Sequence, residues 1–277
     1  MTLDRLSAYI NDSYVGDRLH FYYDRPSAFN DFFNKVRMDA NIKNAVLSAK
    51  DLGRFSTIMY QFDERYLLDA RMKGKYVDLT FEDFKLKWGK TSNLNGTANF
   101  KGFPDLKKTY TRLDFKPSHM SWQDVSQYSP NADFQKYIKK TDQLTLSGTF
   151  DGLYNDFKSK PVLVSNQLGK IAGEVNVKLT NISEQSTYYG DLDVNSFDLG
   201  KLFDQDIVQK LSFKGKIKGS GLKIDDASLE LDGLVSEIGY NNYNYKNITV
   251  DGKLGQSIFD GYVDIKDPNL VAEVEGK

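Results

Sequence analysis

The stretch from Leu211 to Leu222, LSFKGKIKGSGL, carries the pattern that decides the fold. Its apolar residues Leu211, Phe213 and Ile217 alternate with serine and lysine. Successive side chains of an extended strand point to opposite sides, so this alternation places apolar and charged groups on opposite faces. A period of two is typical of a half-buried β-strand and not of a helix.

The same alternation dominates the chain from Tyr66 onward and predicts ten or more strands. Long strands with short turns and few helical stretches favour an all-β fold with a few short helices. We predict an elongated, curled antiparallel sheet that forms an open apolar groove. The residues predicted to line its apolar side are Leu68, Ala70, Met72, Phe84, Leu86, Trp88, Ala98, Phe100, Leu113, Phe115, Leu144, Leu146, Phe150, Ile171, Val175, Val177, Leu179, Leu192, Val194, Phe213, Ile217, Leu229, Leu231, Ile248, Val250, Leu254, Phe259, Val263 and Ile265.

A glycine recurs on the apolar register, in the form apolar-x-Gly-x-apolar. Glycine inside a strand marks a bend, a bulge or a close approach of two backbones. Repetition on one face predicts a sheet that curls around that face, and scattered bulges of an ordinary barrel are the alternative. The six positions are Gly96, Gly148, Gly173, Gly215, Gly252 and Gly261.

Composition agrees with a sheet that has one wet face. Apolar residues make up 40% of the 277 residues, and the chain has 17 Tyr and 18 Phe. The 37 Lys and Arg and 38 Asp and Glu are interspersed and leave a net charge of -1, which does not indicate a nucleic-acid partner. No apolar run approaches the length of a membrane-spanning helix. The chain begins and ends in strand-like sequence, so we expect a segment of a longer protein.

Three short helical stretches are predicted, at 29–36, 122–128 and 197–211. The first has apolar residues at helical spacing: Phe29, Phe32, Phe33 and Val36. We predict one elongated domain over 1–277, with a weak subdivision near 116–141 that has the composition of a loop.

The sequence offers no catalytic centre, so we predict no enzyme activity, no cofactor and no metal site. Cysteine is absent, and His20 and His119 have no second histidine at ligand spacing. There is no nucleophile elbow and no phosphate-binding loop. The acidic pair Asp225–Asp226 is predicted to lie in a turn, and carboxylates that meet only in the fold remain an alternative.

A hairpin tip is predicted at Asn241–Asn242, because asparagine tolerates left-handed backbone angles. The neighbouring Tyr240, Tyr243 and Tyr245 either brace the sheet as cross-strand pairs or form a platform on which a sugar stacks.

An apolar face of this length has to be covered. Acyl chains suit it, because burial of each CH₂ is worth about 0.8 kcal/mol and needs no directional partner. The alternative is a second sheet packed against the first in a sandwich.

Several segments, in this order, resemble one known family. They are Asp39–Asn44, Lys101–Asp105, Phe197–Leu202, Leu211–Leu222, Ala227–Gly233, Tyr243–Gly252, Phe259–Gly261 and Asp267–Leu270. Together they resemble the periplasmic middle segment of TamB-like proteins of the Bacteroidetes type, within the AsmA-like, repeating β-groove superfamily. The resemblance covers most of residues 25–277, and residues 1–24 match it less well.

This resemblance implies a β-taco with an apolar interior that moves phospholipid between the inner and outer membranes of a Gram-negative bacterium, for outer-membrane biogenesis. It implies a periplasmic location, a tether to the inner membrane and an outer-membrane partner of the Omp85 type, both through parts of the full-length protein that are absent here. The family has no catalytic residues, so only groove lining transfers, onto the alternating positions named above. Two alternatives stay open: a scaffold of a translocation and assembly module that assists outer-membrane protein insertion, and a glycan-binding β-domain.

Overall fold

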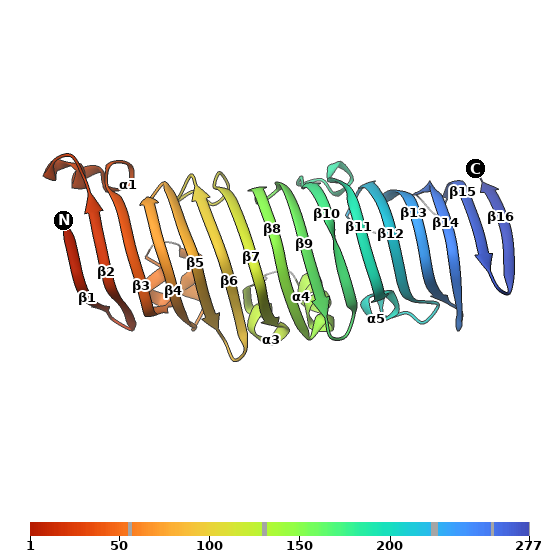
Figure 1. The fold of residues 1–277 in the computed structure, drawn as a ribbon, viewed down its shortest axis with the longest axis horizontal. Helices are drawn as coiled ribbons and strands as arrows, with labels where there is room; N and C mark the ends of the chain where they lie inside the picture. Colours follow the sequence, from red (N-terminus) through yellow and green to blue (C-terminus); the bar gives the residue numbers. More distant parts are fainter. Residues whose placement is uncertain (55–56, 129–131, 223–226, 256–257, 277) are drawn as a thin grey trace. The chain divides into compact units, whose positions relative to one another are not determined.

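In a computed structural model of the chain, which describes residues 1–54, 57–128, 132–222, 227–255 and 258–276, strands dominate (Figure 1). Sixteen antiparallel strands in this part of the chain follow one another in sequence order. The predicted all-β fold with a few short helices is therefore confirmed. The turn predicted at Asp225–Asp226 lies outside the described residues.

The chain divides into two compact units. Unit 1 comprises Met1–Ala132 and Thr145–Tyr154, and unit 2 comprises Asp133–Leu144 and Asn155–Lys277. The strands of unit 1 are β1 (Thr2–Ile10), β2 (Ser13–Tyr22), β3 (Arg37–Ser48), β4 (Arg65–Lys75), β5 (Asp78–Trp88), β6 (Ser92–Lys101), β7 (Tyr110–Ser121) and most of β8 (Gln143–Leu153). Unit 2 contains β9 (Asp156–Ser165), β10 (Gly169–Lys178), β11 (Thr187–Asp198), β12 (Val208–Ser220), β13 (Ser228–Tyr240), β14 (Tyr243–Gly255), β15 (Ile258–Asp267) and β16 (Leu270–Gly276).

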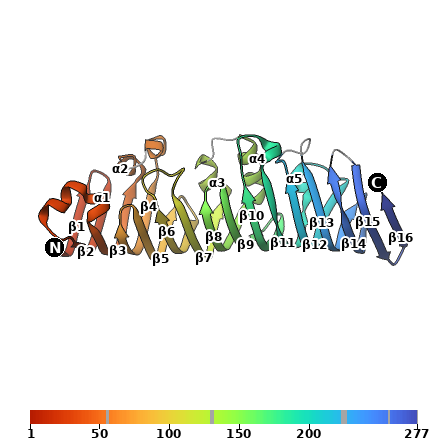
Figure 2. The same cartoon turned by 90° about the horizontal axis from the view of Figure 1, so that it is seen from above.

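Short helices connect some of these strands. In unit 1 they are η1 (Pro26–Asp31), α1 (Phe32–Lys35), α2 (Ala49–Leu52), η2 (Thr57–Gln61), α3 (Trp122–Val125) and η3 (Ser126–Tyr128). The helices of unit 2 are α4 (Ala132–Thr141), η4 (Ser183–Gln185) and α5 (Leu199–Phe203). In unit 1, α2 and α3 lie to one side of the strands (Figure 2). In unit 2, α4 and α5 lie to one side of the strands in the same way.

Two predicted helical stretches need correction, and one is confirmed. The stretch 122–128 is helical throughout. The first stretch is a 3₁₀-helix followed by a single α-turn, and the third is helical only over Leu199–Phe203. The region 116–141 is not a loop, because it holds the end of β7, α3, η3 and α4.

A four-strand repeat positions the helices. In unit 1, α2 follows β3 and lies at the tip of the β1–β2 hairpin, and α3 follows β7 at the tip of β5–β6. The backbone N–H groups of Ser48 and Ser121 donate to the hydroxyls of Ser13 and Ser92 in these tips, at 2.9 and 3.0 Å. In unit 2 the N–H of Asp198, before α5, donates instead to a carbonyl of the β9–β10 turn.

Within each unit the strands form an open sheet that is not strongly curled, so the tight curl predicted from the glycines is wrong (Figure 2). The glycines instead permit close approach to the neighbouring strand. Gly173 has φ +153°, and a Cβ there would lie 2.1 Å from the carbonyl oxygen of Asp191 on β11. Gly96 has the same φ, and a Cβ there would lie 2.1 Å from the carbonyl oxygen of Asp114 on β7. Only glycine fits these sites without a shift of backbone.

Candidate functional site

The apolar face of unit 2 is a set of cross-strand rows. Val194, Phe213 and Val235 face one another on β11, β12 and β13, and Val250 pairs with Val263 on β14 and β15. The buried members of this cluster are Val194, Phe213 and Val250. The apolar residues that pack against them are only partly buried: Ile171, Leu192, Phe197, Leu211, Ile217, Leu231, Val235, Phe259 and Val263.

Aromatic rings fill the space above several glycines of this face. The ring of Phe213 lies over Gly215 and over Gly233 on the next strand, so that a Cβ at either position would lie 2.9 Å from it. The Phe259 ring lies over Gly252 in the same way. The glycines therefore leave room for the rings inside the apolar layer. The rings supply the packing contacts that a glycine, which has no side chain, cannot make.

The apolar face of unit 1 has two clusters along the strands. Ala70, Phe84 and Ala98 form the buried centre of the larger one, with Leu68, Phe81, Leu86, Leu94, Phe100, Leu113 and Phe115 partly buried around it. The other centres on Ala40, Ile42 and Ala45, and Val15, Leu19, Leu68 and Met72 pack against it.

Helices cover one end of the unit 1 face. Trp88 packs with Ala49, Phe62 and Tyr66, and its indole N–H donates to the backbone oxygen of Asp124 at 3.3 Å. Residues of α2, η2, α3 and η3 complete this cluster: Leu52, Met59, Val125 and Tyr128. Trp88 was predicted to line an open face but lies under helices.

The predicted lining residues are buried or half-buried, with one exception, Leu254, whose exposed fraction is 48%. Leu179 lies just beyond the end of β10. The clusters above bring together nineteen of the predicted residues. Those that belong to none of them are Leu144, Leu146, Phe150, Val175, Val177, Leu179, Leu229, Ile248, Leu254 and Ile265.

Sequence reasoning missed the apolar residues of the first three strands, such as Val15, Leu19 and Ala40. The alternation of Met38, Ala40 and Ile42 was a usable signal. The pattern breaks between Ile42 and Ala45, where a bulge shifts the register against β4 and carries Asn44 at φ +51°. Phe81, Leu94 and Val235 also belong to the apolar clusters and were not predicted.

A buried aspartate fastens α3 to the β5–β6 tip. The Asp124 carboxylate accepts hydrogen bonds from the backbone N–H groups of Lys90, Thr91 and Ser92 at 3.0 to 3.1 Å, and from the Ser92 hydroxyl at 2.8 Å. Burial by itself raises the pKa of this carboxyl, but these donors and Ser121 outweigh it and hold the pKa at about 2. The ionised carboxylate therefore acts as a structural clasp.

Asp51 forms the equivalent clasp in the first repeat. Its carboxylate accepts hydrogen bonds from the side chains of Asn11 and Ser13, each at 2.7 Å, and these bonds lower its pKa. Both clasps join a short helix to a hairpin tip.

The predicted hairpin tip is confirmed. Asn241 and Asn242 have φ of 48° and 65° between the paired Tyr240 and Tyr243. Tyr243 donates its hydroxyl hydrogen to buried Asp267 at 2.7 Å, and the Asn269 amide donates to the Tyr243 oxygen at 2.6 Å. The Tyr243 and Tyr245 rings meet edge to face at 4.6 Å. These contacts are those of a brace.

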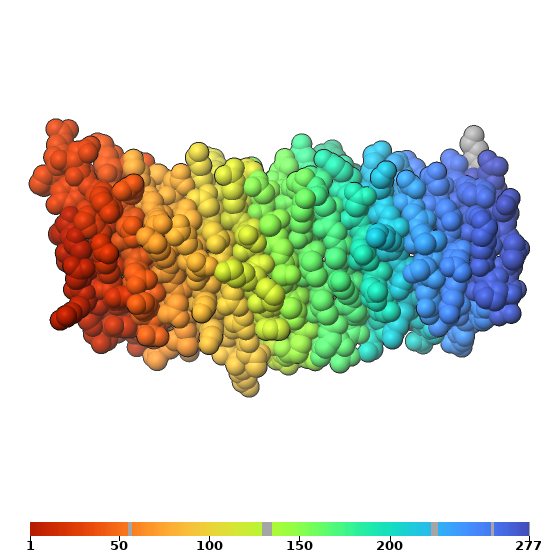
Figure 3. Space-filling model, viewed as in Figure 1, coloured from red at the N-terminus to blue at the C-terminus, as the bar shows by residue number. Residues whose placement is uncertain are grey.

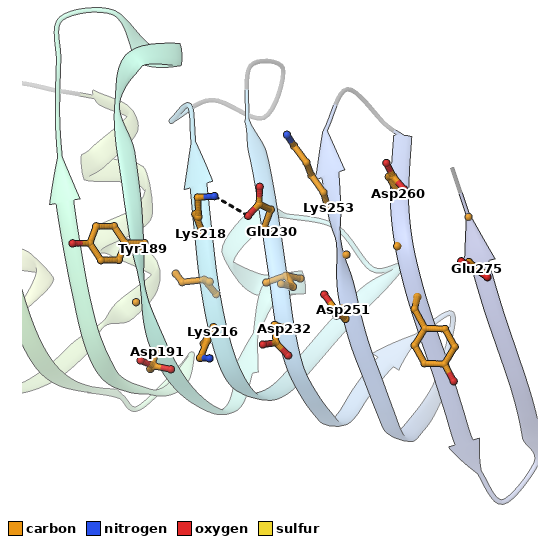
Figure 4. Close-up of a pocket in the computed structure, with 17 residues that line it drawn as sticks. Tyr189, Asp191, Lys216, Lys218, Glu230, Asp232, Asp251, Lys253, Asp260 and Glu275 are labelled. Atoms are coloured by element: carbon orange, nitrogen blue, oxygen red, sulfur yellow. Dashed lines mark hydrogen bonds and ion pairs between the residues drawn. The ribbon is translucent and has the colours of Figure 1, made fainter.

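The polar face of unit 2 carries a shallow furrow across β11–β16, with a volume of about 740 Å³ (Figure 4). Its floor is a row of residues with four glycines, Gly190, Gly252, Gly261 and Gly276, and charged rows flank it. Six carboxylates face three lysines there, and Lys218 and Glu230 form an ion pair at 3.1 Å. Figure 3 shows one face of each unit, with successive strands as bands that no other described segment overlies.

The remaining candidates for chemistry lie apart. His20 contacts the Thr2 hydroxyl, and His119 contacts the Thr145 hydroxyl at 3.1 Å. No group of three acidic or histidine side chains suited to a metal ion exists among the described residues. In the same part of the chain, no helix has the length and apolar character needed to cross a membrane.

Comparison of the chain with protein-family models, with curated proteins and with solved structures finds no match. An antiparallel sheet of 16 strands is compatible with a repeating β-groove protein and does not by itself identify one.

Proposed function

We propose that this chain holds phospholipid acyl chains on the apolar faces of its sheet, as a segment of a lipid-transfer groove. The observation that carries the proposal is the apolar face of unit 2, where three buried residues are surrounded by nine that stay partly exposed. No second sheet packs over this face in the described part of unit 2.

Acyl chains fit such a face for two physical reasons. Each buried CH₂ gains about 0.8 kcal/mol, so a chain of ordinary length gains enough to offset its loss of freedom. Dispersion and hydrophobic contacts have no preferred direction, so a bound chain can move along the rows without breaking hydrogen bonds.

The resemblance of most of residues 25–277 to TamB-like proteins supports a more specific role. In that role the chain is a periplasmic segment of a Gram-negative envelope protein and passes phospholipid between the inner and outer membranes. An inner-membrane tether and an Omp85-type outer-membrane partner would act through other parts of the full-length protein.

Photo-crosslinking at neighbouring positions tests the proposal directly. Ile217 and Val263 lie on the apolar face, and Lys216 and Tyr262 occupy the adjacent positions on the polar face. A photoreactive residue at Ile217 or Val263 should capture labelled phospholipid, and one at Lys216 or Tyr262 should not. Equal capture on both faces, or none on either, contradicts the proposal.

Native mass spectrometry of the purified chain provides a second readout, the mass of a co-purified phospholipid. The two alternatives predict other products. Capture of unfolded outer-membrane protein at Ile217, without lipid, indicates an assembly scaffold. Glycan binding that disappears in Tyr243→Ala indicates a glycan-binding domain, although the Tyr243 hydroxyl is already engaged by Asp267.

A further inference from the structure

One end of unit 1 gathers aromatic side chains from three connections. The β2–β3 connection contains Phe29 and Phe33, the β4–β5 turn contains Tyr76, and the β6–β7 loop contains Phe103. Antiparallel pairing brings these connections to the same end of the strands, the end at which α1 lies in Figure 1. We call it the aromatic end.

None of these rings is buried. Phe29 has an exposed fraction of 37% and Phe33 of 46%, and both lie on the η1–α1 segment. Large apolar side chains that remain exposed together are the feature that marks an interaction surface, whereas a single exposed one is ordinary.

Ring contacts lead from this end onto the apolar sheet face. Phe33 stacks on Tyr76 with centroids 4.2 Å apart, and Tyr76 lies 6.1 Å from Phe103. Phe103 in turn lies 5.2 Å from Phe100, which packs against the buried cluster around Phe84. The exposed end and the apolar face are therefore one continuous apolar surface.

The same end is cationic. Residues 21–37, 74–78 and 100–110 contain seven Lys and Arg and four Asp, a net charge of +3 in a chain whose total is -1. Two of the aspartates, Asp31 and Asp105, pair with Lys35 and Lys108. Lys75, Lys101 and Lys107 form no ion pair with any described residue. The furrow on unit 2 has the opposite charge, with six carboxylates to three lysines.

We propose that the aromatic end of unit 1 binds the surface of a bilayer that contains anionic phospholipids. Phe29 and Phe33 enter the boundary between headgroups and acyl chains, and the unpaired lysines contact anionic headgroups. The path of rings then connects the bilayer to the apolar face. That last step, passage of an acyl chain along the rings, rests on the proposed function, whereas the binding step does not.

Vesicle co-sedimentation of the full chain tests the binding step, with phosphatidylcholine vesicles and with vesicles of phosphatidylcholine and phosphatidylglycerol. We expect binding to the anionic vesicles only, weakened by salt. The double variant Phe29→Ser, Phe33→Ser should bind at least about tenfold more weakly, because it loses the two exposed rings that the proposal buries in the bilayer. The matched control, Leu67→Ser with Leu234→Ser, removes apolar side chains with exposed fractions of 50% and 46% elsewhere and should bind like the unmodified chain.

A lysine series separates charge from apolar insertion. Lys75→Gln, Lys101→Gln and Lys107→Gln should each weaken binding about fivefold. Lys170→Gln, Lys178→Gln and Lys210→Gln remove exposed lysines of unit 2 and should have no effect. Circular dichroism of every variant identifies those that fail to fold, and the remaining variants of each series then decide the result.

The outcomes separate this inference from the proposed function. If the chain binds anionic vesicles but contains no co-purified phospholipid, the proposal that the aromatic end binds a bilayer is supported and the acyl-chain proposal is contradicted. If phospholipid co-purifies with the chain but the chain does not bind vesicles, only the proposal of bilayer binding by the aromatic end is overturned. A concentration-dependent dimer that dissociates in Phe29→Ser, Phe33→Ser, together with no vesicle binding, also overturns it and identifies a second copy as the occupant.

Discussion

The ring of Phe213 on β12 lies over the backbone of Gly233 on β13, with its Cε2 atom 2.9 Å from where a Cβ of Gly233 would stand. Gly233 pairs directly with Gly215, so two adjacent strands both lack side chains at the place that the ring occupies. The exposed fraction of Phe213 is therefore only 5%, in a layer whose other members are mostly partly exposed.

Gly233→Ala should destabilise unit 2 by about 1 to 3 kcal/mol, because the new methyl group meets the ring and two backbone atoms and overpacks the layer. Its Cβ would lie 2.5 Å from the carbonyl oxygen of Lys214 and 2.7 Å from the Cα of Gly215. Urea unfolding followed by circular dichroism measures the change. Gly255→Ala is the control, since its nearest neighbour is 3.6 Å away, and a loss of equal size there would refute the explanation.

An acidic residue on the apolar face should separate lipid binding from folding. Val177 is half-buried, so Val177→Asp leaves the carboxylate in contact with water and should abolish phospholipid capture in a folded chain. Phe213→Asp places a charge in a buried site and should unfold unit 2 instead. Thermal unfolding and lipid crosslinking are measured on both variants, and full lipid capture by folded Val177→Asp speaks against an acyl-chain face.

Asp124→Asn tests the clasp through its dependence on pH. The folded pKa of about 2 lies below the ordinary value of 3.8, so the ionised carboxylate stabilises the fold above pH 4. This contribution, about 2 kcal/mol, disappears as the pH falls from about 4 to 2.

The unmodified chain should therefore be more stable than Asp124→Asn at pH 7, and the two should converge near pH 2 in urea unfolding. Asp63→Asn is the control, because the Asp63 side chain is 93% exposed and its pair with Lys50 lies at the surface. A stability difference for Asp124→Asn that stays constant from pH 7 to pH 2 is incompatible with the clasp.

Two tyrosines at one hairpin distinguish a brace from a sugar platform. Tyr243→Phe removes the hydroxyl that contacts Asp267 and Asn269 and should lower the midpoint of thermal unfolding. Tyr245→Phe keeps the edge-to-face ring contact and removes a hydroxyl with no hydrogen bond to another described residue, so it should leave the midpoint unchanged. Equal midpoints for the two variants argue against the brace.

Several features of the fold were predictable because they depend on neighbouring residues. Alternation over Leu211–Ile217 indicated a strand with one apolar face, and the turn residues Asn241 and Asn242 indicated the hairpin. The helix over 122–128 was likewise predicted from local sequence. Strands β1 to β3 were not, because register shifts between Leu3 and Leu6, between Tyr14 and Asp17, and between Ile42 and Ala45 interrupt the period of two.

Other features depend on contacts between distant residues. The role of Gly215 could not be read locally, because the atoms that require a glycine belong to Asp232 and Gly233 on the next strand. The cover over Trp88 comes from helices that start at Ala49 and Trp122. The aromatic end combines three connections that are separated by dozens of residues.

The amino-acid sequence by itself determined which side is apolar in the strands that alternate without interruption, since that depends only on the alternation of side chains along an extended backbone. The tertiary structure alone decided how much of that side stays open. Exposure depends on which strands pair, on which rings settle over which glycines, and on where the clasps of Asp51 and Asp124 hold the helices, and all of these join residues far apart in the chain.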